Sequence, residues 1–377
     1  MSSLFTSRPT AAEINLDHLA FNFRSVQGFV GPGVDLMAVV KADAYGHGSV
    51  PCSQRLEAEG VKWFAVATVE EGVELREAGI TKPILILGSF WPGQERAVLN
   101  FDLTPVIFRT DQAQALAKAA RQQGSAAAVH VKIDTGMGRI GVRLEEVAAF
   151  ASELSTIENI EIEGLMTHFA VADDLAAAEF TNHQIRAFEK AVAVFHAQGN
   201  RPRYIDMANS PGAVVHPLSR SKMVRIGGLL YGLGGDVLPE GVPHPELRPV
   251  MSIGSKIAQI KTITVGESVG YGRTFIAERS TVVATIPIGY HDGIPRPLSN
   301  AGHFLVNGLR APIIGRVSMD WTTIDVTDIP NLAVGDDVTI IGESGDELIR
   351  AEDLASIAET ISYEITCGIG QRIPRRY

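Results

Sequence analysis

Polar residues follow the apolar runs of the first two thirds of the chain, at points where they could carry out chemistry. The stretch DLMAVVKADAYGHG (35–48) places Lys41 directly after an apolar run. A lysine in that place is either a solvated residue at the end of a strand or a nucleophilic amine. Further polar residues follow later runs in the same way: Lys132, Arg139, His168, Asn209, Ser210 and Arg225.

Taken singly, each of these residues has an ordinary structural explanation. The stretch ANSP is a common start of a helix, with its asparagine as the N-cap. A Gly-Gly pair, such as Gly227 and Gly228, is commonly a turn or a close packing site, and a single histidine such as His168 is more often a hydrogen-bonded core residue. Their placement at successive strand ends is what favours a shared site.

The elements that would position these residues alternate between strands and helices. Helix-compatible segments such as TVEEGVELREAG separate the runs, and this alternation predicts parallel βα units that close into a (β/α)8 barrel. Pro105 interrupts the fourth of these runs. The expected strands are residues 36–40, 63–67, 84–88, 103–108, 129–134, 162–169, 203–208 and 223–232.

The polar residues listed above would then meet at the C-terminal mouth of the barrel, where active sites of this fold lie. The stretches ANSPG and RIGG offer a hydroxyl, a helix start and unshielded backbone N–H groups, which suit a phosphate. A phosphate pocket opposite a lysine suggests pyridoxal 5'-phosphate (PLP) held as a Schiff base by Lys41. Burial and cationic neighbours would favour the neutral amine that this bond needs.

The pattern of predicted secondary structure changes after about residue 245. Strand-like runs separated by Gly and Asp turns continue to the end, with one helical stretch, AEDLASIAETI. We therefore expect a barrel domain over residues 1–245 and a mainly-β domain over residues 246–377. The first twelve or so residues could pack on this second domain.

Composition narrows the class of protein. The 377 residues carry a formal net charge of −10 and show no basic stripe, which argues against a nucleic-acid partner. The first ten residues lack the pattern of a signal peptide, and no apolar run approaches the roughly 18–20 residues that span a bilayer. Two distant cysteines suggest neither a disulfide framework nor a metal cluster. We expect a cytoplasmic protein with no membrane partner and no metal site.

Several motifs, in order from residue 11 to about residue 375, resemble the alanine racemase family. They are AEINLDHLAFNF, AVVKADAYGHG, KIDTGMGRIGV, GLMTHFAVADD, ANSPG, VRIGGLLYG, VGYGRTF, IPIGYHDG and GRVSMDW. The resemblance implies a PLP-dependent isomerase with a barrel followed by a β domain. The implied reaction interconverts L- and D-alanine by two-base proton transfer through the external aldimine. A broader racemase acting on serine or basic amino acids is the alternative.

The resemblance also implies roles for individual residues. Lys41 would be the Schiff-base lysine and one base, and Tyr271 the base on the opposite face of the substrate. His168 would link that tyrosine to Arg225, the partner of the pyridine nitrogen. Arginine keeps its proton, so the ring nitrogen would stay unprotonated and transamination would be disfavoured.

The remaining implied roles concern the cofactor, the substrate and the entrance. Arg139 would contact the cofactor oxygen and the substrate carboxylate, and Lys132 matches a position that is carbamylated in many members. The phosphate would be held by Tyr45, Ser210 and Gly228, and Asn209 and Gly227 would also bind the cofactor. The Met319 backbone would lie at the substrate carboxylate, and the entrance would be lined by Tyr290, Asp320, Arg296 and Arg316.

In the family, the β-domain residues of each site come from the neighbouring subunit, so the resemblance implies a homodimer. Gln371 stands where some members have a phosphate-binding tyrosine, which puts that contact in doubt, and His291 replaces an expected small residue. A related PLP decarboxylase would favour an acidic residue in place of Arg225, and a non-catalytic PLP carrier would lack the second domain. The substrate range, and a role in D-alanine supply for peptidoglycan or in D-alanine catabolism, stay open.

Overall fold

The computed structural model describes residues 8–377, so expectations for residues 1–7 lie outside the described part. Contacts divide the chain into two units. The barrel unit comprises Leu19–Ala44 and Ser49–Arg248. Of the described residues, the C-terminal unit comprises 8–18, Tyr45–Gly48 and Pro249–Tyr377. Each unit is described by itself.

Eight parallel strands close the barrel unit, in the order β5-β4-β3-β2-β10-β9-β8-β6, and β5 pairs with β6 to complete the ring. This closure confirms the predicted (β/α)8 barrel. The strands are β2 (Asp35–Val39), β3 (Trp63–Val66), β4 (Ile84–Ile86), β5 (Thr104–Ile107), β6 (Ala127–Asp134), β8 (Ile160–Met166), β9 (Tyr204–Asp206) and β10 (Met223–Ile226). The two-residue strand β7 (Val142–Arg143) pairs with β6 outside the ring.

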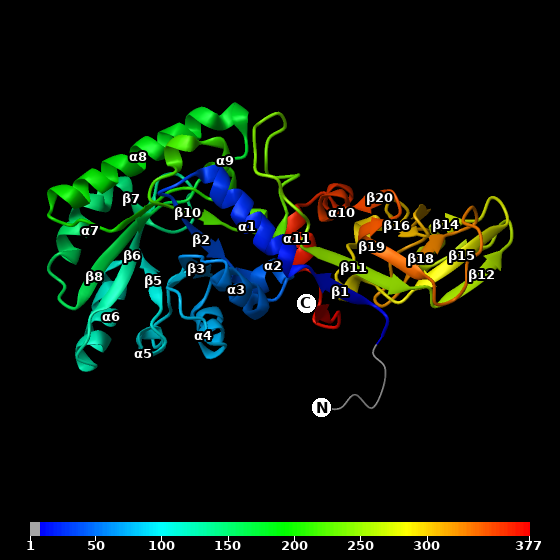
Figure 1. Cartoon of the computed structure of the whole chain (residues 1–377), viewed down its shortest axis with the longest axis horizontal. Coiled ribbons are helices and arrows are strands. Elements are labelled where there is room, and N and C mark those ends of the chain that lie inside the picture. The colour runs from blue at the N-terminus through cyan, green and yellow to red at the C-terminus, as the bar shows by residue number, and fades with distance from the viewer. Residues whose placement is uncertain (1–7) are drawn as a thin grey trace. The chain divides into compact units, whose positions relative to one another are not determined.

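Helices surround these strands on the outside (Figure 1). They are α1 (Leu16–Val30), α3 (Ser49–Ala58), α4 (Val69–Glu77), α5 (Glu95–Asn100), α6 (Thr110–Gln122), α7 (Val147–Leu154), α8 (Ala178–Ala197) and α9 (Ser210–Val215). Most strand residues are buried because both faces of the strands are covered, which explains their apolar runs. Strand β8 is an exception at its start, where its first four residues are exposed or half-buried. Pro105 is the second residue of β5 and does not prevent the strand.

The expectation of a strand over residues 223–232 is correct only for its first half. The chain leaves the sheet at Gly227 and forms a 3-10 turn over Gly228–Tyr231. Leu229, Leu230 and Tyr231 are buried in that turn, so the apolar run continues although the strand has ended. Apolar runs of this length do not distinguish a buried strand from a buried helical turn.

The C-terminal unit is mainly β, as predicted. One sheet has the order β17-β16-β19-β11-β1-β21, with β20 on β19, and a second has the order β12-β15-β18. The strands are β1 (Ala11–Ile14), β11 (Met251–Lys256), β12 (Gln259–Ile263), β13 (Ser268–Val269), β14 (Phe275–Ile276), β15 (Thr281–Ile286), β16 (His303–Val306), β17 (Leu309–Pro312), β18 (Thr322–Asp325), β19 (Asp337–Ser344), β20 (Glu347–Ile349) and β21 (Arg375–Arg376). The helices are α10 (Ala351–Ala358) and α11 (Ser362–Cys367).

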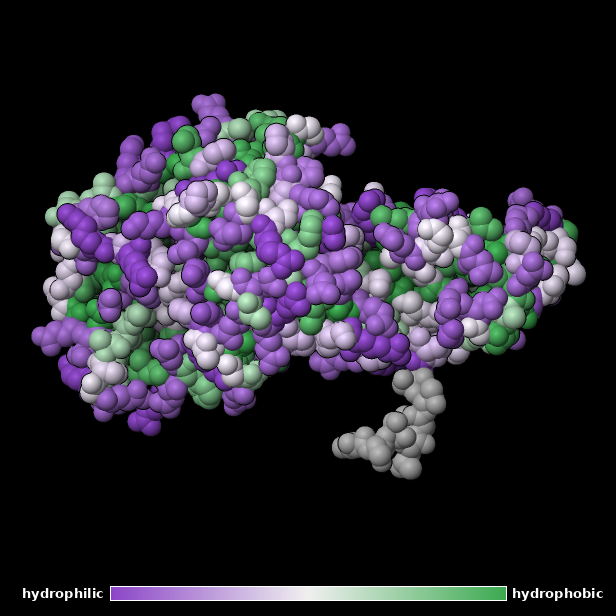
Figure 2. Space-filling model, in the orientation of Figure 1, coloured by the Kyte–Doolittle hydropathy of each residue, from purple (hydrophilic) through white to green (hydrophobic). Residues whose placement is uncertain are grey.

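Hydrophilic residues cover most of the face seen in Figure 2, with small apolar patches among them. None of the helices in residues 8–377 is long and apolar enough to cross a membrane.

Candidate active site

A turn of left-handed backbone follows Lys41. The segment Lys41–Gly46, α2, has the hydrogen-bonding pattern of a helix, but Ala42, Asp43, Ala44 and Tyr45 all have φ between +52° and +55°. A left-handed helical residue other than glycine costs about 1–2 kcal/mol. Four such residues in succession therefore need strong support from their surroundings, and they lie directly after the predicted Schiff-base lysine.

The last part of this segment belongs to the C-terminal unit. The ring of Tyr45 packs edge-on against Tyr363, with 5.3 Å between the ring centroids. Burial raises the pKa of the Tyr45 hydroxyl, so Tyr45 is a hydrogen-bond donor rather than a base. A Cβ on Gly46 would lie 2.1 Å from the carbonyl oxygen of Thr366, which explains the glycine at this position.

The loop after β6 presents Arg139, which is exposed. Asp134 Oδ1 accepts hydrogen bonds from the backbone N–H groups of Gly136 and Gly138, each at 3.0 Å. Gly141 has φ +137°, and a Cβ there would lie 2.6 Å from the Asp134 nitrogen. The glycines of DTGMGRIG thus allow a tight turn that is organised by one carboxylate.

Arg225 lies on β10 and is held on two sides. Its Nη1 forms an ion pair with Asp206 Oδ1 on the adjacent strand β9, at 2.6 Å. Its Nη2 donates to the carbonyl oxygen of Thr167 at 2.8 Å and lies 3.2 Å from His168 Nδ1. Because arginine keeps its protons, His168 Nδ1 must accept, and the proton of a neutral His168 ring is then on Nε2.

Electrostatics link these residues with the two lysines. Burial, together with the positive charges of Arg225, Arg139 and Lys41, lowers the pKa of Lys132 to about 7. Burial, and then Arg225 and other cationic neighbours, lowers the pKa of His168 to about 2, so this ring is neutral. The barrel unit therefore brings together five of the predicted site residues, and their surplus positive charge suits anionic groups.

The stretches ANSPG and RIGG meet as predicted. Asn209 is the N-cap of α9, since its Oδ1 accepts from the Gly212 N–H at 3.0 Å. Ser210 Oγ accepts from the Gly227 N–H at 3.0 Å. Gly227 and Gly228 are buried beside these residues, so two loops of the barrel form one lining with a hydroxyl and backbone amides.

In the C-terminal unit, Tyr271 lies in a short turn against Arg316. Gly272 has φ +74°, and a Cβ there would lie 2.8 Å from Arg316 Nη1. Tyr271 is 71% exposed in a single chain. A cavity of about 260 Å³ beside this turn is lined by Arg296, Pro297, Ser299 and Arg316.

Tyr290 and Met319 are joined through the backbone. The N–H of Tyr290 donates to the carbonyl oxygen of Ser318 at 2.9 Å, and that of His291 to the carbonyl oxygen of Met319 at 3.1 Å. Tyr290, His291 and Met319 all have exposed side chains. The structure thus brings the predicted entrance residues Arg296 and Arg316 together at one cavity. It places the predicted entrance residue Tyr290 beside the chain segment of Met319 and Asp320.

Several residues that support the site were not among those predicted from the sequence. Asp206 is the buried counter-ion of Arg225, and Gln184 of α8 donates to Thr135 Oγ1 at 3.2 Å and to the carbonyl oxygen of His168 at 3.1 Å. In the C-terminal unit, Arg372 bridges Asp292 and Asp320 at 3.0 and 2.8 Å. An acidic residue inside the apolar run YIDMA was the signal for Asp206.

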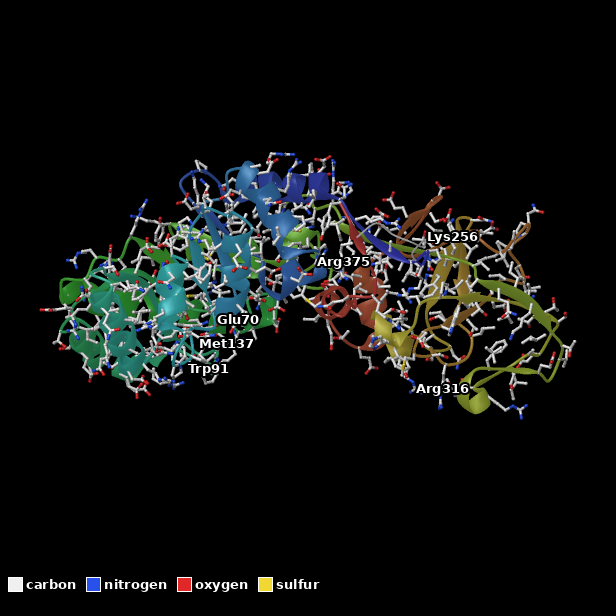
Figure 3. The ribbon with its side chains drawn as sticks, turned by 90° about the horizontal axis from the view of Figure 1, so that it is seen from below. Glu70, Trp91, Met137, Lys256, Arg316 and Arg375 are labelled. Carbon is white, nitrogen blue, oxygen red and sulfur yellow. The ribbon has the colours of Figure 1, made fainter. Side chains whose placement is uncertain are left out.

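The loops that follow the barrel strands carry exposed side chains, among them Trp91. Glu70, Trp91 and Met137 follow β3, β4 and β6, and Figure 3 labels them on the barrel unit. Trp91 is 78% exposed, although tryptophan is usually well covered. An uncovered aromatic ring therefore lies on one of the loops that follow the barrel strands.

Two family models match nearly all of the chain. Residues 14–234 match the N-terminal domain of alanine racemase, and residues 250–377 match its C-terminal domain. The chain belongs to the alanine racemase family. Alanine racemase from Halothermothrix orenii is 44% identical over 376 residues, which cover 98% of this chain and 97% of that protein.

Solved alanine racemase structures have the same fold. The enzyme from Bacillus anthracis with bound L-Ala-P superposes with a TM-score of 0.91 at 35% identity, covering 98% of this chain and 95% of the other. The enzyme from Bartonella henselae with covalently bound pyridoxal phosphate superposes with a TM-score of 0.87 at 30% identity, covering 98% and 99%.

Proposed function

We propose that this protein interconverts L- and D-alanine, with PLP held by Lys41 and with Lys41 and Tyr271 as the two bases. The observation that carries the proposal is the cationic cluster of Lys41, Lys132, Arg139 and Arg225 at one end of a barrel of this family. Its surplus positive charge fits a phosphate dianion and an amino-acid carboxylate. The names of the relatives support alanine over a wider substrate range.

The residues present fit PLP. Ser210, Asn209, Gly227 and Gly228 would hold the phosphate, together with Tyr45, whose raised pKa keeps its hydroxyl protonated. When bound, PLP would supply the electron sink that makes the substrate Cα–H acidic. Gln371, exposed on the C-terminal unit, would replace the tyrosine of other members only as a weaker donor.

Racemisation needs a proton to leave one face of the substrate and another to arrive on the opposite face. The Lys41 amine would act on one face and the Tyr271 hydroxyl on the other. A free tyrosine has a pKa of about 10 and is a poor base. A neutral His168 with its proton on Nε2 would donate to the Tyr271 oxygen and so favour its ionised form.

Arg225 would face the pyridine nitrogen as a permanent cation, which keeps that nitrogen unprotonated. Arg139 would bind the substrate carboxylate, with the Met319 backbone beside it. A Lys132 pKa of about 7 supplies the neutral amine that carbamylation requires, and the added anion would pair with Arg139.

The proposed assembly is a homodimer in which each site takes Tyr271 from the partner subunit. Exposed large side chains on each unit are consistent with cover by a partner: Trp91 on the barrel unit, and Tyr271, Tyr290, Met319 and Trp321 on the C-terminal unit. We further propose a cytoplasmic enzyme that supplies D-alanine for peptidoglycan, with D-alanine catabolism as the alternative role.

The chemistry is tested with single enantiomers of alanine, serine and lysine, by following racemisation and loss of α-deuterium. We expect alanine to be the preferred substrate. Tyr271→Phe should abolish most turnover and retain bound PLP, whereas Lys41→Ala should lose covalent PLP. Absence of exchange from both alanine enantiomers would refute the assignment, and loss of PLP from Tyr271→Phe would show a structural role for that residue.

Shared sites are tested by mixing the two inactive variants under conditions that allow subunits to exchange. A mixed dimer of Lys41→Ala and Tyr271→Phe would contain one site with both wild-type residues. Random mixing of a shared-site dimer should restore about a quarter of wild-type activity. No recovery despite verified exchange would show that each chain builds its own site.

A further inference from the structure

The peptide bond that follows Lys41 is held by Glu71 of helix α4. The N–H of Ala42 donates to Glu71 Oε1 at 2.7 Å. The other carboxylate oxygen, Oε2, accepts from the N–H of Ala67 at 2.6 Å and of Thr68 at 3.3 Å. One side chain thus joins the turn after Lys41 to the chain that leaves strand β3.

Hydrogen bonds fix the backbone on both sides of Lys41. On its N-terminal side, the carbonyl oxygen of Val40, which belongs to the Val40–Lys41 peptide, accepts from the Ala44 N–H at 2.9 Å. On its C-terminal side, Glu71 holds the Ala42 N–H. Because each peptide group is planar, fixing both groups sets the direction of the Cα–Cβ bond of Lys41.

The left-handed turn gives this contact a particular importance. Its non-glycine residues prefer right-handed backbone, so the conformation persists only where neighbouring groups enforce it. Ala42 is the first of them, and Ala44 follows with its N–H on the carbonyl oxygen of Val40 at 2.9 Å. Without an acceptor for Ala42, the turn would lose a bond at the point where the handedness of the chain reverses.

Helix capping does not account for the position of Glu71. As the third residue of α4 it also takes part in a capping box with Thr68, but those two hydrogen bonds measure 3.3 and 3.4 Å. The shorter bonds run to Ala42 and Ala67, outside the helix. A carboxylate is suited to this double task because both of its oxygens accept, whereas glutamine offers one.

We infer that Glu71 is a positioning residue for Lys41. The inference rests on the proposed role of Lys41, and it assigns to Glu71 the task of holding the lysine backbone in the geometry that lets its amine reach the cofactor and the substrate. Glu71 acts through the Lys41–Ala42 peptide and takes no part in proton transfer.

The test compares Glu71→Gln with Glu70→Gln in the full-length protein. Glu70 is its neighbour in the first turn of α4, is exposed, and accepts from Gln94 Nε2 at 2.7 Å, so the control removes a similar charge. The readouts are the PLP dissociation constant, the circular dichroism of the bound PLP band, kcat and KM. Hydrogen exchange of residues 40–46 in the PLP-free protein is a readout that does not depend on the cofactor.

We expect Glu71→Gln to weaken PLP binding and lower kcat by about ten- to a hundredfold, as for the loss of a hydrogen bond to a charged group. The PLP dichroism should change, and exchange should accelerate in residues 40–46 more than elsewhere. Glu70→Gln should stay within about twofold of wild type. Glu71→Asp keeps the charge but is too short to reach both Ala42 and Ala67, so it should show the same effects. It replaces Glu71→Gln as the test variant if Glu71→Gln folds poorly.

Two contrary results are separable. If Lys41→Ala retains PLP as the wild type does, the proposed role of Lys41 is wrong, and with it the purpose assigned to Glu71. If Lys41 proves essential but Glu71→Gln and Glu71→Asp match Glu70→Gln in PLP binding, dichroism and local exchange, only the positioning role is overturned.

Discussion

Asp206→Asn removes the carboxylate that lies 2.6 Å from the Arg225 guanidinium, in a place where both side chains are buried. The variant leaves Arg225 charged, because arginine does not release its proton. At that separation and an effective dielectric constant of about 20, the attraction lost is about 6 kcal/mol. Burial raises the pKa of Asp206, so removing the carboxylate also recovers some desolvation cost. We expect a net loss of about 3 kcal/mol in the free energy of unfolding, as found for broken buried pairs.

Removing both charges separates the pair interaction from the loss of either residue alone. Asp206→Leu and Arg225→Met should each destabilise the protein, but the double variant should be more stable than the sum of the single effects predicts. The coupling free energy should be at least about 2 kcal/mol, since two apolar side chains can replace a buried pair at little cost.

Urea unfolding of the PLP-free protein measures these differences. Trp63 is buried in the barrel unit, whereas Trp321 lies in the C-terminal unit, so a Trp321→Phe background lets fluorescence report mainly on the barrel. Changes in the midpoint at constant slope give the free-energy differences. Single-variant costs that add to within about 0.5 kcal/mol in the double variant would refute the coupling of Asp206 and Arg225.

Three further predictions concern the barrel unit. The pKa of Lys132 is lowered from its usual 10.5 to about 7, so between these values the unfolded chain binds a proton that the folded protein does not. In CO2-free buffer, the free energy of unfolding of wild type should therefore rise with pH over this range, relative to Lys132→Met, by up to about 1.4 kcal/mol per pH unit. If the free energies of unfolding of the two proteins ran parallel with pH, the pKa shift would be contradicted. Gly164→Ala would place a Cβ 2.5 Å from the buried His130 ring and should lower the free energy of unfolding by about 1–3 kcal/mol. The loss should be smaller in a His130→Ala background, and an equal shift of the urea midpoint in both backgrounds would refute the clash. Gly28→Ala, in helix α1 with no atom within 4 Å of the added Cβ, should instead stabilise by about 0.5–1 kcal/mol, and a lower midpoint would show that the helix needs this glycine.

The barrel could be predicted because its signals are local and repeated. Each strand is a short apolar run, each run is followed by a helical pattern, and Lys41, Lys132 and His168 come at or after the ends of such runs. The rule that strand ends meet at one mouth then placed these residues together, and the electrostatic coupling of Lys132 with Arg225, Arg139 and Lys41 agrees with it. The error at residues 227–232 arose because Gly227 ends the strand while the apolar run continues.

The residues that support the site could not be predicted in the same way. Asp206 and Arg225 are 19 positions apart and meet only because β9 and β10 are neighbours in the closed sheet. Glu71 has the sequence signature of an acidic residue in the first turn of a helix, but this signature does not reveal its contact outside the helix. Its second partner, Ala42, lies 29 positions earlier in the chain and donates through the backbone, which every residue but proline can do.

The left-handed turn after Lys41 explains why these contacts are distant in sequence. Alanine, aspartate, alanine and tyrosine have no local preference for positive φ, so the segment cannot specify its own conformation. Glycine would adopt it without strain, but it would also leave the backbone around Lys41 free to move in the absence of a ligand. A chain that must hold one lysine amine in place is better served by residues that take this conformation only under external constraint. The constraint then has to come from groups such as the Glu71 carboxylate, and that dependence is what the comparison of Glu71→Gln with Glu70→Gln measures.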